Sequence, residues 1–112
     1  MSQERLNAYR IMWVFVFFDL PTSTRKEQKI AAHFRKQLMY DGFSMLQYSV
    51  YIRNCASRES MEVHIKRVQS MIPEHGHISM MSVTDKQYGE IMNFWGIKSS
   101  PLQEGPKQLE LF

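Results

Sequence analysis

A nearly unbroken apolar run close to the start of the chain constrains the fold most. Residues 11–18 read Ile-Met-Trp-Val-Phe-Val-Phe-Phe, and Asp19 ends the run. Such a stretch of β-branched and aromatic residues is typical of a strand buried on both faces. It is too short for a membrane span, which needs about 20 residues, and it lacks the small-residue cleavage site of a signal peptide. We therefore predict a buried strand over Tyr9 to Phe18, no membrane association and a cytoplasmic location.

The bulk properties agree with one soluble globular domain. The chain has 112 residues, of which 44% are hydrophobic and 22% charged. The single cysteine, Cys55, excludes an internal disulfide and predicts a small buried side chain. The net charge is +3, and residues 1–56 carry eight Lys and Arg against four Asp and Glu. This basic excess in the first half favours a polyanionic partner.

The segment after the first strand has the pattern of an amphipathic helix from Thr24 to Asp41. Thr24 and Glu27 have the spacing of a capping box, and Gly42 is well placed to end the helix. The apolar stripe predicted to face the core consists of Ile30, Ala31, Phe34 and Leu38.

The rest of the chain predicts two more strand regions around a second helix. Residues 43–54 are β-like, with a slip in the alternation at Met45-Leu46 that indicates either a bulge or a tight hairpin. A helix from Ser57 to Met71 and a strand from Ile78 to Val83 follow, then one possible helical turn.

The resulting β-α-β(β)-α-β order predicts an α+β fold, the ferredoxin-like sandwich, with an antiparallel sheet and two helices on one face. The second face of such a sheet is uncovered, and its aromatic side chains favour a homodimer. We expect one domain over residues 1–95, with a short N-terminal extension, and a C-terminal tail over 96–112.

Asp19 is the first candidate for chemistry because it follows an apolar strand directly. A carboxylate at a strand end can hold Mg²⁺, which takes few carboxylates and keeps several waters. The ion could then activate water against a phosphodiester. The alternative is a structural Asp that caps the turn before Pro21. No second acid lies near Asp19 in sequence, which argues against strong catalysis.

Basic residues on the first helix are the second candidate. They lie opposite the apolar stripe and could contact phosphates, or they could form an ordinary solvated helix face. Further positive charge follows the middle strands. The predicted nucleic-acid-binding residues are Arg25, Lys26, Lys29, Lys36, Arg53 and Arg58. The histidines form no recognisable metal motif, and His75 and His77 are read as loop residues beside Gly76.

Three segments together resemble the Cas2 family of CRISPR-associated proteins. They are Val14-Phe15-Val16-Phe17-Phe18-Asp19-Leu20-Pro21, the stretch from Gly42 to Tyr51, and Val83-Thr84-Asp85-Lys86-Gln87-Tyr88. The resemblance covers roughly residues 10–95. Many family members carry Tyr where this chain has Phe18. The longer start and the ending resemble forms that accompany type II systems.

The resemblance implies a ferredoxin-like homodimer that bridges two dimers of the CRISPR integrase and binds duplex prespacer DNA. It also implies a Mg²⁺-dependent endonuclease, usually an endoribonuclease, with Asp19 as the catalytic metal ligand and RNA as a further substrate. The alternating ending, Leu109, Leu111 and Phe112, would bind a partner by strand addition, unless the tail lacks fixed structure.

Two other functions fit the residues. One is a stand-alone ribonuclease of the related toxin type, in which Asp19 would be essential for RNA cleavage. The other is a dimeric ferredoxin-like regulator that binds a small ligand and has no affinity for nucleic acid.

Overall fold

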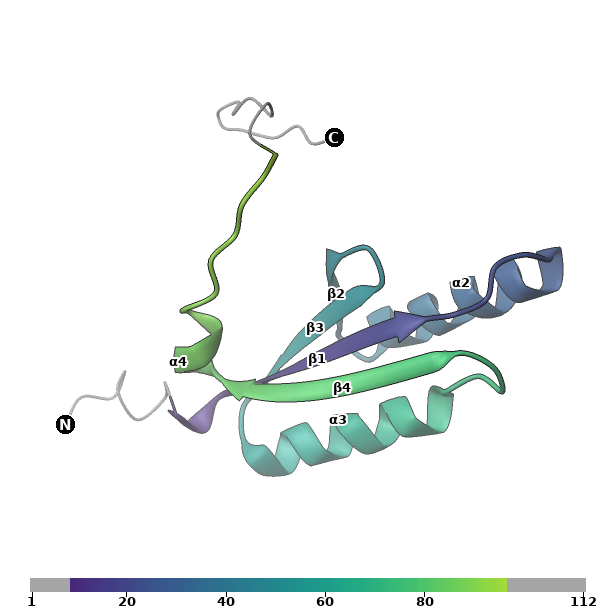
Figure 1. Cartoon of the computed structure of the whole chain (residues 1–112). Helices are drawn as coiled ribbons and strands as arrows, with labels where there is room; N and C mark the ends of the chain where they lie inside the picture. The colour runs from purple at the N-terminus through teal and green to yellow at the C-terminus, as the bar shows by residue number, and fades with distance from the viewer. Residues whose placement is uncertain (1–8, 97–112) are drawn as a thin grey trace.

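The apolar run forms a central strand of a four-stranded antiparallel sheet. The structure is a computed structural model, and it describes residues 9–96. The strands lie side by side in the order β2-β3-β1-β4 (Figure 1). Their bounds are β1 Met12–Asp19, β2 Ser44–Gln47, β3 Val50–Cys55 and β4 His77–Thr84. With the helices in between, this is the predicted α+β, ferredoxin-like architecture.

The first strand begins later than the sequence predicted. Tyr9 and Arg10 are helical and exposed, and β1 starts at Met12. The composition of residues 9–11 did not reveal the boundary, because hydrogen bonding to neighbouring strands decides where a strand begins.

Both predicted helices form, within one residue of the expected limits. The first, α2 (Arg25–Tyr40), has the Thr24–Glu27 capping box, and the second, α3 (Arg58–Met71), is capped by the Ser57 hydroxyl. Gly42 follows α2 with a φ of 93°, a conformation that favours glycine.

The helices share one core with the sheet. Their buried side chains pack against Met12, Val14, Val16 and Phe18 of β1 in a single cluster. Ile30 is an exception to the predicted stripe, since its side chain is 41% exposed. It lines an open cavity between α2 and the segment that follows α3.

The middle β region contains both irregularities that the phase slip allowed. The β2–β3 register shifts between Met45 and Gln47, and a tight turn at Tyr48–Ser49 joins the strands. Ser49 has a φ of 65°, which is unusual for a residue other than glycine. The turn was hard to place because neither Gly nor Asn occupies it.

The other sheet face carries Trp13, Phe15, Phe17 and Asp19 of β1, which alternate with the core residues. We call it the open face. A short helix, α4 (Asp85–Tyr88), lies at its far end from Asp19. The ring of Tyr88 stacks on Trp13 with 3.8 Å between centroids, and Trp13 Nε1 donates a hydrogen bond of 2.7 Å to Asp85.

No helix within residues 9–96 is long and apolar enough to cross a membrane. The N-terminal extension up to residue 8 and the predicted partner-binding residues Leu109, Leu111 and Phe112 lie outside the described part of the chain.

Candidate nucleic-acid and metal site

Asp19 is the last residue of β1 and is held from both sides. On one side, Phe18 N donates a hydrogen bond of 3.1 Å to the carbonyl of Ser49 in the β2–β3 turn. On the other, Asp19 pairs directly with His77, the first residue of β4. The backbone at Asp19 is therefore fixed by the sheet, while the side chain is exposed on the open face.

His77 is the first residue of β4, whereas the sequence pattern predicted that it lies in a loop. Gly76 makes the difference, because its φ of 115° turns the chain sharply into β4. A Cβ on Gly76 would lie 3.1 Å from the Asp19 carbonyl oxygen and 2.5 Å from Leu20 Cδ2. Glycine thus lets the end of the α3–β4 connection pack directly on the end of β1, which brings His77 beside Asp19.

The surroundings of the Asp19 carboxylate fit a hard cation. In the described part of the chain, no ion pair includes Asp19, and no group of three or more His, Cys, Asp or Glu side chains could hold a metal by itself. Mg²⁺ commonly binds through one or two carboxylates and keeps several waters, so one exposed carboxylate is compatible with such an ion. Asp19 is the residue that would hold the ion.

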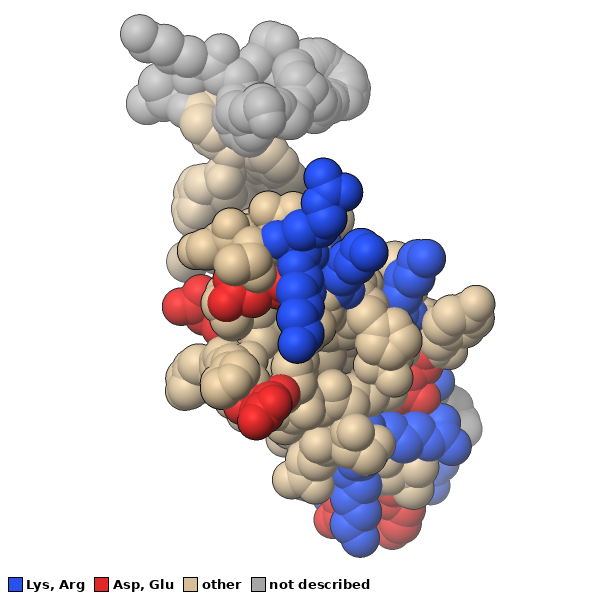
Figure 2. All heavy atoms as spheres, turned by 90° about the vertical axis from the view of Figure 1, so that its right-hand side faces the viewer, with Lys and Arg blue, Asp and Glu red and all other residues tan. Residues whose placement is uncertain are grey.

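The four predicted basic residues of α2 are all exposed on its outer face. They lie there because Ala31, Phe34 and Leu38 occupy the opposite, buried side of the helix. Figure 2 looks onto the end of the molecule where α2 begins, and basic side chains project from much of that view, with acidic ones between them. We call the set Arg25, Lys26, Lys29 and Lys36 the basic stripe.

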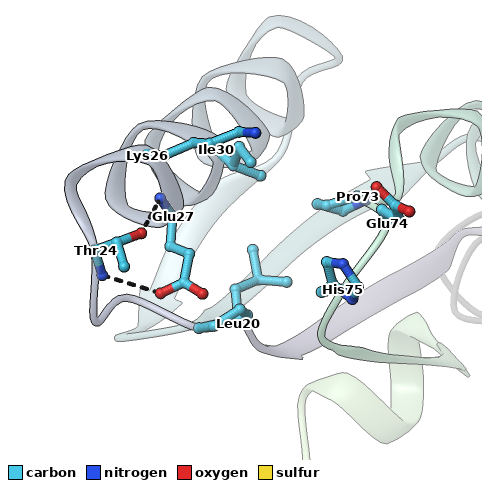
Figure 3. A pocket seen from close by; sticks show the side chains of 9 residues that line it. Leu20, Thr24, Lys26, Glu27, Ile30, Pro73, Glu74 and His75 are labelled. Atoms are coloured by element: carbon cyan, nitrogen blue, oxygen red, sulfur yellow. Dashed lines mark hydrogen bonds between the residues drawn. The ribbon is translucent and has the colours of Figure 1, made fainter.

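A cavity of about 260 Å³ lies between the start of α2 and the α3–β4 connection. In Figure 3, Lys26 and Ile30 extend from α2 on one side, and Pro73 and His75 lie on the other. Leu20 lies between the two sides, so the cavity has an apolar base and charged groups at its rim. It is next to the Asp19 end of the sheet.

The structure does not bring the other two predicted basic residues to this region. Arg53 Nε donates to the Asp41 carbonyl at 2.7 Å, and its Nη1 donates to the Asn54 carbonyl at 2.6 Å. Arg58 is exposed at the start of α3. This helix follows the end of β3, and that end of β3 pairs with the start of β1, so Arg58 lies near the start of β1. Both remain predicted nucleic-acid contacts, but they are separate from the basic stripe.

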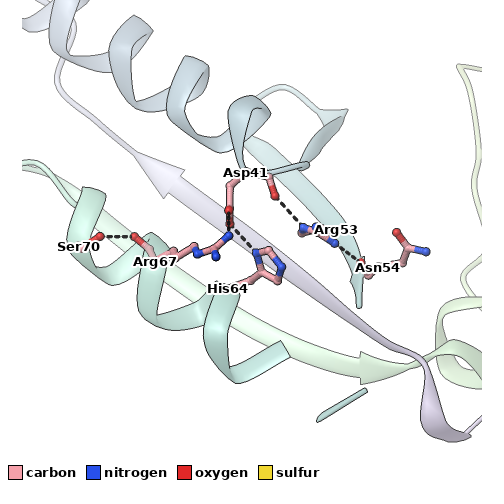
Figure 4. Close-up of polar contacts among 6 residues, drawn as sticks. All are labelled: Asp41, Arg53, Asn54, His64, Arg67 and Ser70. Atoms are coloured by element: carbon pink, nitrogen blue, oxygen red, sulfur yellow. Dashed lines mark hydrogen bonds and ion pairs between the residues drawn. The ribbon is translucent and has the colours of Figure 1, made fainter. Parts of the chain in front are cut away.

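A polar network surrounds Asp41, which the sequence pattern predicted only as the end of the first helix. Asp41 accepts hydrogen bonds from His64 Nδ1 at 2.7 Å and Arg67 Nη1 at 2.9 Å (Figure 4). Its side chain is only 7% exposed. We call Asp41, His64 and Arg67 the Asp41 network. The i, i+3 spacing of His64 and Arg67 on α3 was the available signal, since it puts both on one helix face.

The pKa of Asp41 reflects this pairing. Burial alone raises the pKa of the carboxyl, but the hydrogen bonds and charges of His64 and Arg67 outweigh it and lower the pKa below the ordinary value of 3.8. An ionised carboxylate only accepts hydrogen bonds, so the facing His64 Nδ1 carries the proton. The network joins the end of α2 to α3.

Cys55 is buried, as predicted. Burial raises the pKa of its thiol more than the neighbouring Arg53 lowers it. The thiol therefore stays protonated at neutral pH and acts as a small packing group.

Comparison with known proteins agrees with this structure. Residues 12–91 match the family model described as CRISPR associated protein Cas2. A CRISPR-associated endoribonuclease Cas2 of Flavobacterium psychrophilum is 58% identical over 96% of this chain and 94% of its own. Proteins of the same name from Parvibaculum lavamentivorans and Paracidovorax avenae are 50% and 40% identical, covering 90% and 96% of this chain and 100% and 99% of theirs. The chain belongs to the Cas2 family of CRISPR-associated proteins.

Proposed function

We propose that this chain is the subunit of a CRISPR spacer-acquisition complex that bridges integrase dimers and binds duplex prespacer DNA. Family membership and the exposed basic stripe together support this function. The four side chains occupy one outer helix face, and exposed Lys and Arg in such an array bind phosphates without reading base sequence. A bridging subunit needs this kind of contact, because new spacers differ in sequence.

The bridging form would be a homodimer joined through the open face. Phe17 is 36% exposed and Met81 is 47% exposed on adjacent strands of that face. Apolar side chains grouped in this way favour contact with another protein surface over contact with water. A two-fold axis through the open face would also place a basic stripe on each side of the dimer.

The proposed dimer would also cleave phosphodiesters when Mg²⁺ is present, acting on RNA or DNA. Asp19 would hold the ion, and the basic stripe would hold the phosphates of the strand. Bound Mg²⁺ would supply a Lewis acid at the phosphoryl oxygen and lower the pKa of a water. The relatives named above carry the word endoribonuclease in their names, which favours a stand-alone ribonuclease as the second candidate.

Charge reversal of the basic stripe tests the main proposal. The triple variant Lys26→Glu, Lys29→Glu, Lys36→Glu should lose at least about tenfold in affinity for duplex DNA, measured by fluorescence anisotropy. The slope of log K against log salt should also become shallower, by about 0.9 for each phosphate that the variant no longer neutralises. Spacer integration with the partner integrase should fall in parallel.

Lys66→Glu is the matched control, because Lys66 is exposed on α3, away from the basic stripe. It should change the affinity by less than about twofold. Wild-type binding and integration by the triple variant would refute the proposed face. A wild-type protein that cuts RNA yet neither binds duplex DNA nor supports integration would favour the stand-alone ribonuclease.

A further inference from the structure

The neighbour of Asp19 on β4 is a potential metal ligand that the sequence placed in a loop. Asp19 and His77 are the last paired residues of the β1–β4 ladder. Residues that face each other in an antiparallel pair point to the same side of the sheet, with Cβ atoms about 4.5–5.5 Å apart. Both side chains are exposed. A carboxylate and an imidazole therefore project together from one corner of the open face.

The fold holds this pair firmly. Asp19 is fixed by the ladder and by the bond from Phe18 N to the Ser49 carbonyl. His77 is fixed by the close packing of Gly76 on Asp19 and Leu20. Sites built on strands hold ligands more precisely than sites on loops. Within residues 9–96 neither side chain takes part in an ion pair, so their ligand atoms are available.

We infer that His77 binds the divalent ion together with Asp19, and that this chain's site consequently prefers a first-row transition ion such as Mn²⁺ to Mg²⁺. The inference rests on the proposed metal-binding role of Asp19 and specifies the ion. Mg²⁺ strongly prefers oxygen ligands, whereas Mn²⁺ accepts carboxylate oxygens and also binds an imidazole nitrogen more readily than Mg²⁺ does. Mg²⁺ would gain little from His77 and would depend on Asp19 alone.

Direct metal binding to the purified, full-length protein tests this inference without nucleic acid. Isothermal titration with Mn²⁺ and with Mg²⁺ gives the ratio of the two affinities. Electron spin echo envelope modulation of bound Mn²⁺ shows whether a nitrogen nucleus is coordinated. Wild-type protein should bind Mn²⁺ more tightly than Mg²⁺ and show nitrogen modulation.

Three variants separate the roles of the side chains. His77→Phe keeps an aromatic ring in the strand but should weaken Mn²⁺ binding about tenfold, leave Mg²⁺ binding within about threefold, and abolish the nitrogen modulation. Asp19→Asn should abolish binding of both ions. His75→Phe, two residues from His77 and outside the ladder, should match wild type in every measurement. Thermal unfolding should be similar for all three variants.

The outcomes also distinguish this inference from the proposed function. Absence of Mn²⁺ binding or of nitrogen modulation in the wild type would overturn the inference, as would modulation that persists in His77→Phe. Unchanged ion binding in Asp19→Asn would overturn both the inference and the proposed metal role of Asp19. A wild-type protein that binds Mn²⁺ through both residues yet fails to bind duplex DNA would refute the DNA-bridging function alone.

Discussion

Two aspartates at the ends of secondary-structure elements have opposite environments in this protein. Asp41, at the end of α2, is 7% exposed and bonds to His64 and Arg67 of α3. Asp19, at the end of β1, is exposed and takes part in no ion pair within the described residues. Each lies beside a glycine with positive φ, Gly42 after Asp41 and Gly76 across from Asp19.

The difference separates a structural carboxylate from one that can bind a ligand. The charge of Asp41 is already compensated by two side chains, so a cation would have to displace them. Within residues 9–96 the charge of Asp19 has no ion-pair partner, so a cation could bind with little rearrangement. The residues that contact an acid at the end of a strand or helix therefore decide whether it is structural or able to bind a ligand. Those residues come from distant parts of the chain.

Removal of the two carboxylates should give the largest contrast. Asp41→Ala leaves His64 buried without its hydrogen-bond partner and should lower the free energy of unfolding by about 2–3 kcal/mol, even though Arg67 is partly exposed. Asp19→Ala leaves no buried group without a hydrogen-bond partner and should change the free energy of unfolding by less than about 0.5 kcal/mol. Urea unfolding followed by circular dichroism measures both values. Equal losses in the two variants would contradict the comparison.

The two glycines offer a smaller contrast. Gly42→Ala and Gly76→Ala should each lower the free energy of unfolding by about 1–2 kcal/mol, since alanine is strained at positive φ. Only Gly76→Ala should also weaken Mn²⁺ binding, because its Cβ would press on the Asp19 backbone. The added Cβ at Gly42 would instead meet the Arg53 guanidinium at 2.9 Å.

Gly89→Ala is the control for the glycine pair. Gly89 has a φ of −66°, and a Cβ there would make only ordinary contacts of 3.5 Å or more. The free energy of unfolding of the Gly89→Ala variant should stay within about 0.5 kcal/mol of wild type. Weaker Mn²⁺ binding in Gly42→Ala, or none of the expected loss in Gly76→Ala, would count against the link between Gly76 and the Asp19 corner.

The smallest expected effect is on the pH dependence of the free energy of unfolding at low pH. Because the folded state lowers the pKa of Asp41, its ionisation stabilises the protein above the ordinary pKa of 3.8, and this stabilisation is lost as the pH falls through the lowered pKa. Asp41→Asn should therefore depend less on pH than wild type in acid, measured by urea unfolding between about pH 5 and pH 2. The wild-type pH dependence in Asp41→Asn would contradict the assignment.

Much of the fold could be predicted from local patterns. The capping box of Thr24 and Glu27, the serine cap of α3 and the stop at Gly42 depend on neighbours within a few residues, and all three are present. The β2–β3 turn was not located, because Ser49 adopts positive φ without the glycine that usually signals it. Ile30 was misplaced because the pattern gives a helix face but not the width of the surface that covers it.

The candidate site could be predicted only in part. Asp19 and the basic stripe follow from strand and helix periodicity, so the sequence was sufficient to propose them. The place of Arg53 was not predictable, since its bond to the Asp41 carbonyl joins β3 to the end of α2. The Asp41 network was missed for the same reason, because 23 and 26 residues separate Asp41 from its two partners.

The sequence by itself determined the order of strands and helices, the buried side of each, and an acid at the end of the first strand. These properties depend on periodicity and on contacts between near neighbours. Only the tertiary structure decided which acid is paired and which is open, and it placed His77 beside Asp19. Strand pairing brings together residues 58 positions apart, and the β1–β4 register sets that juxtaposition.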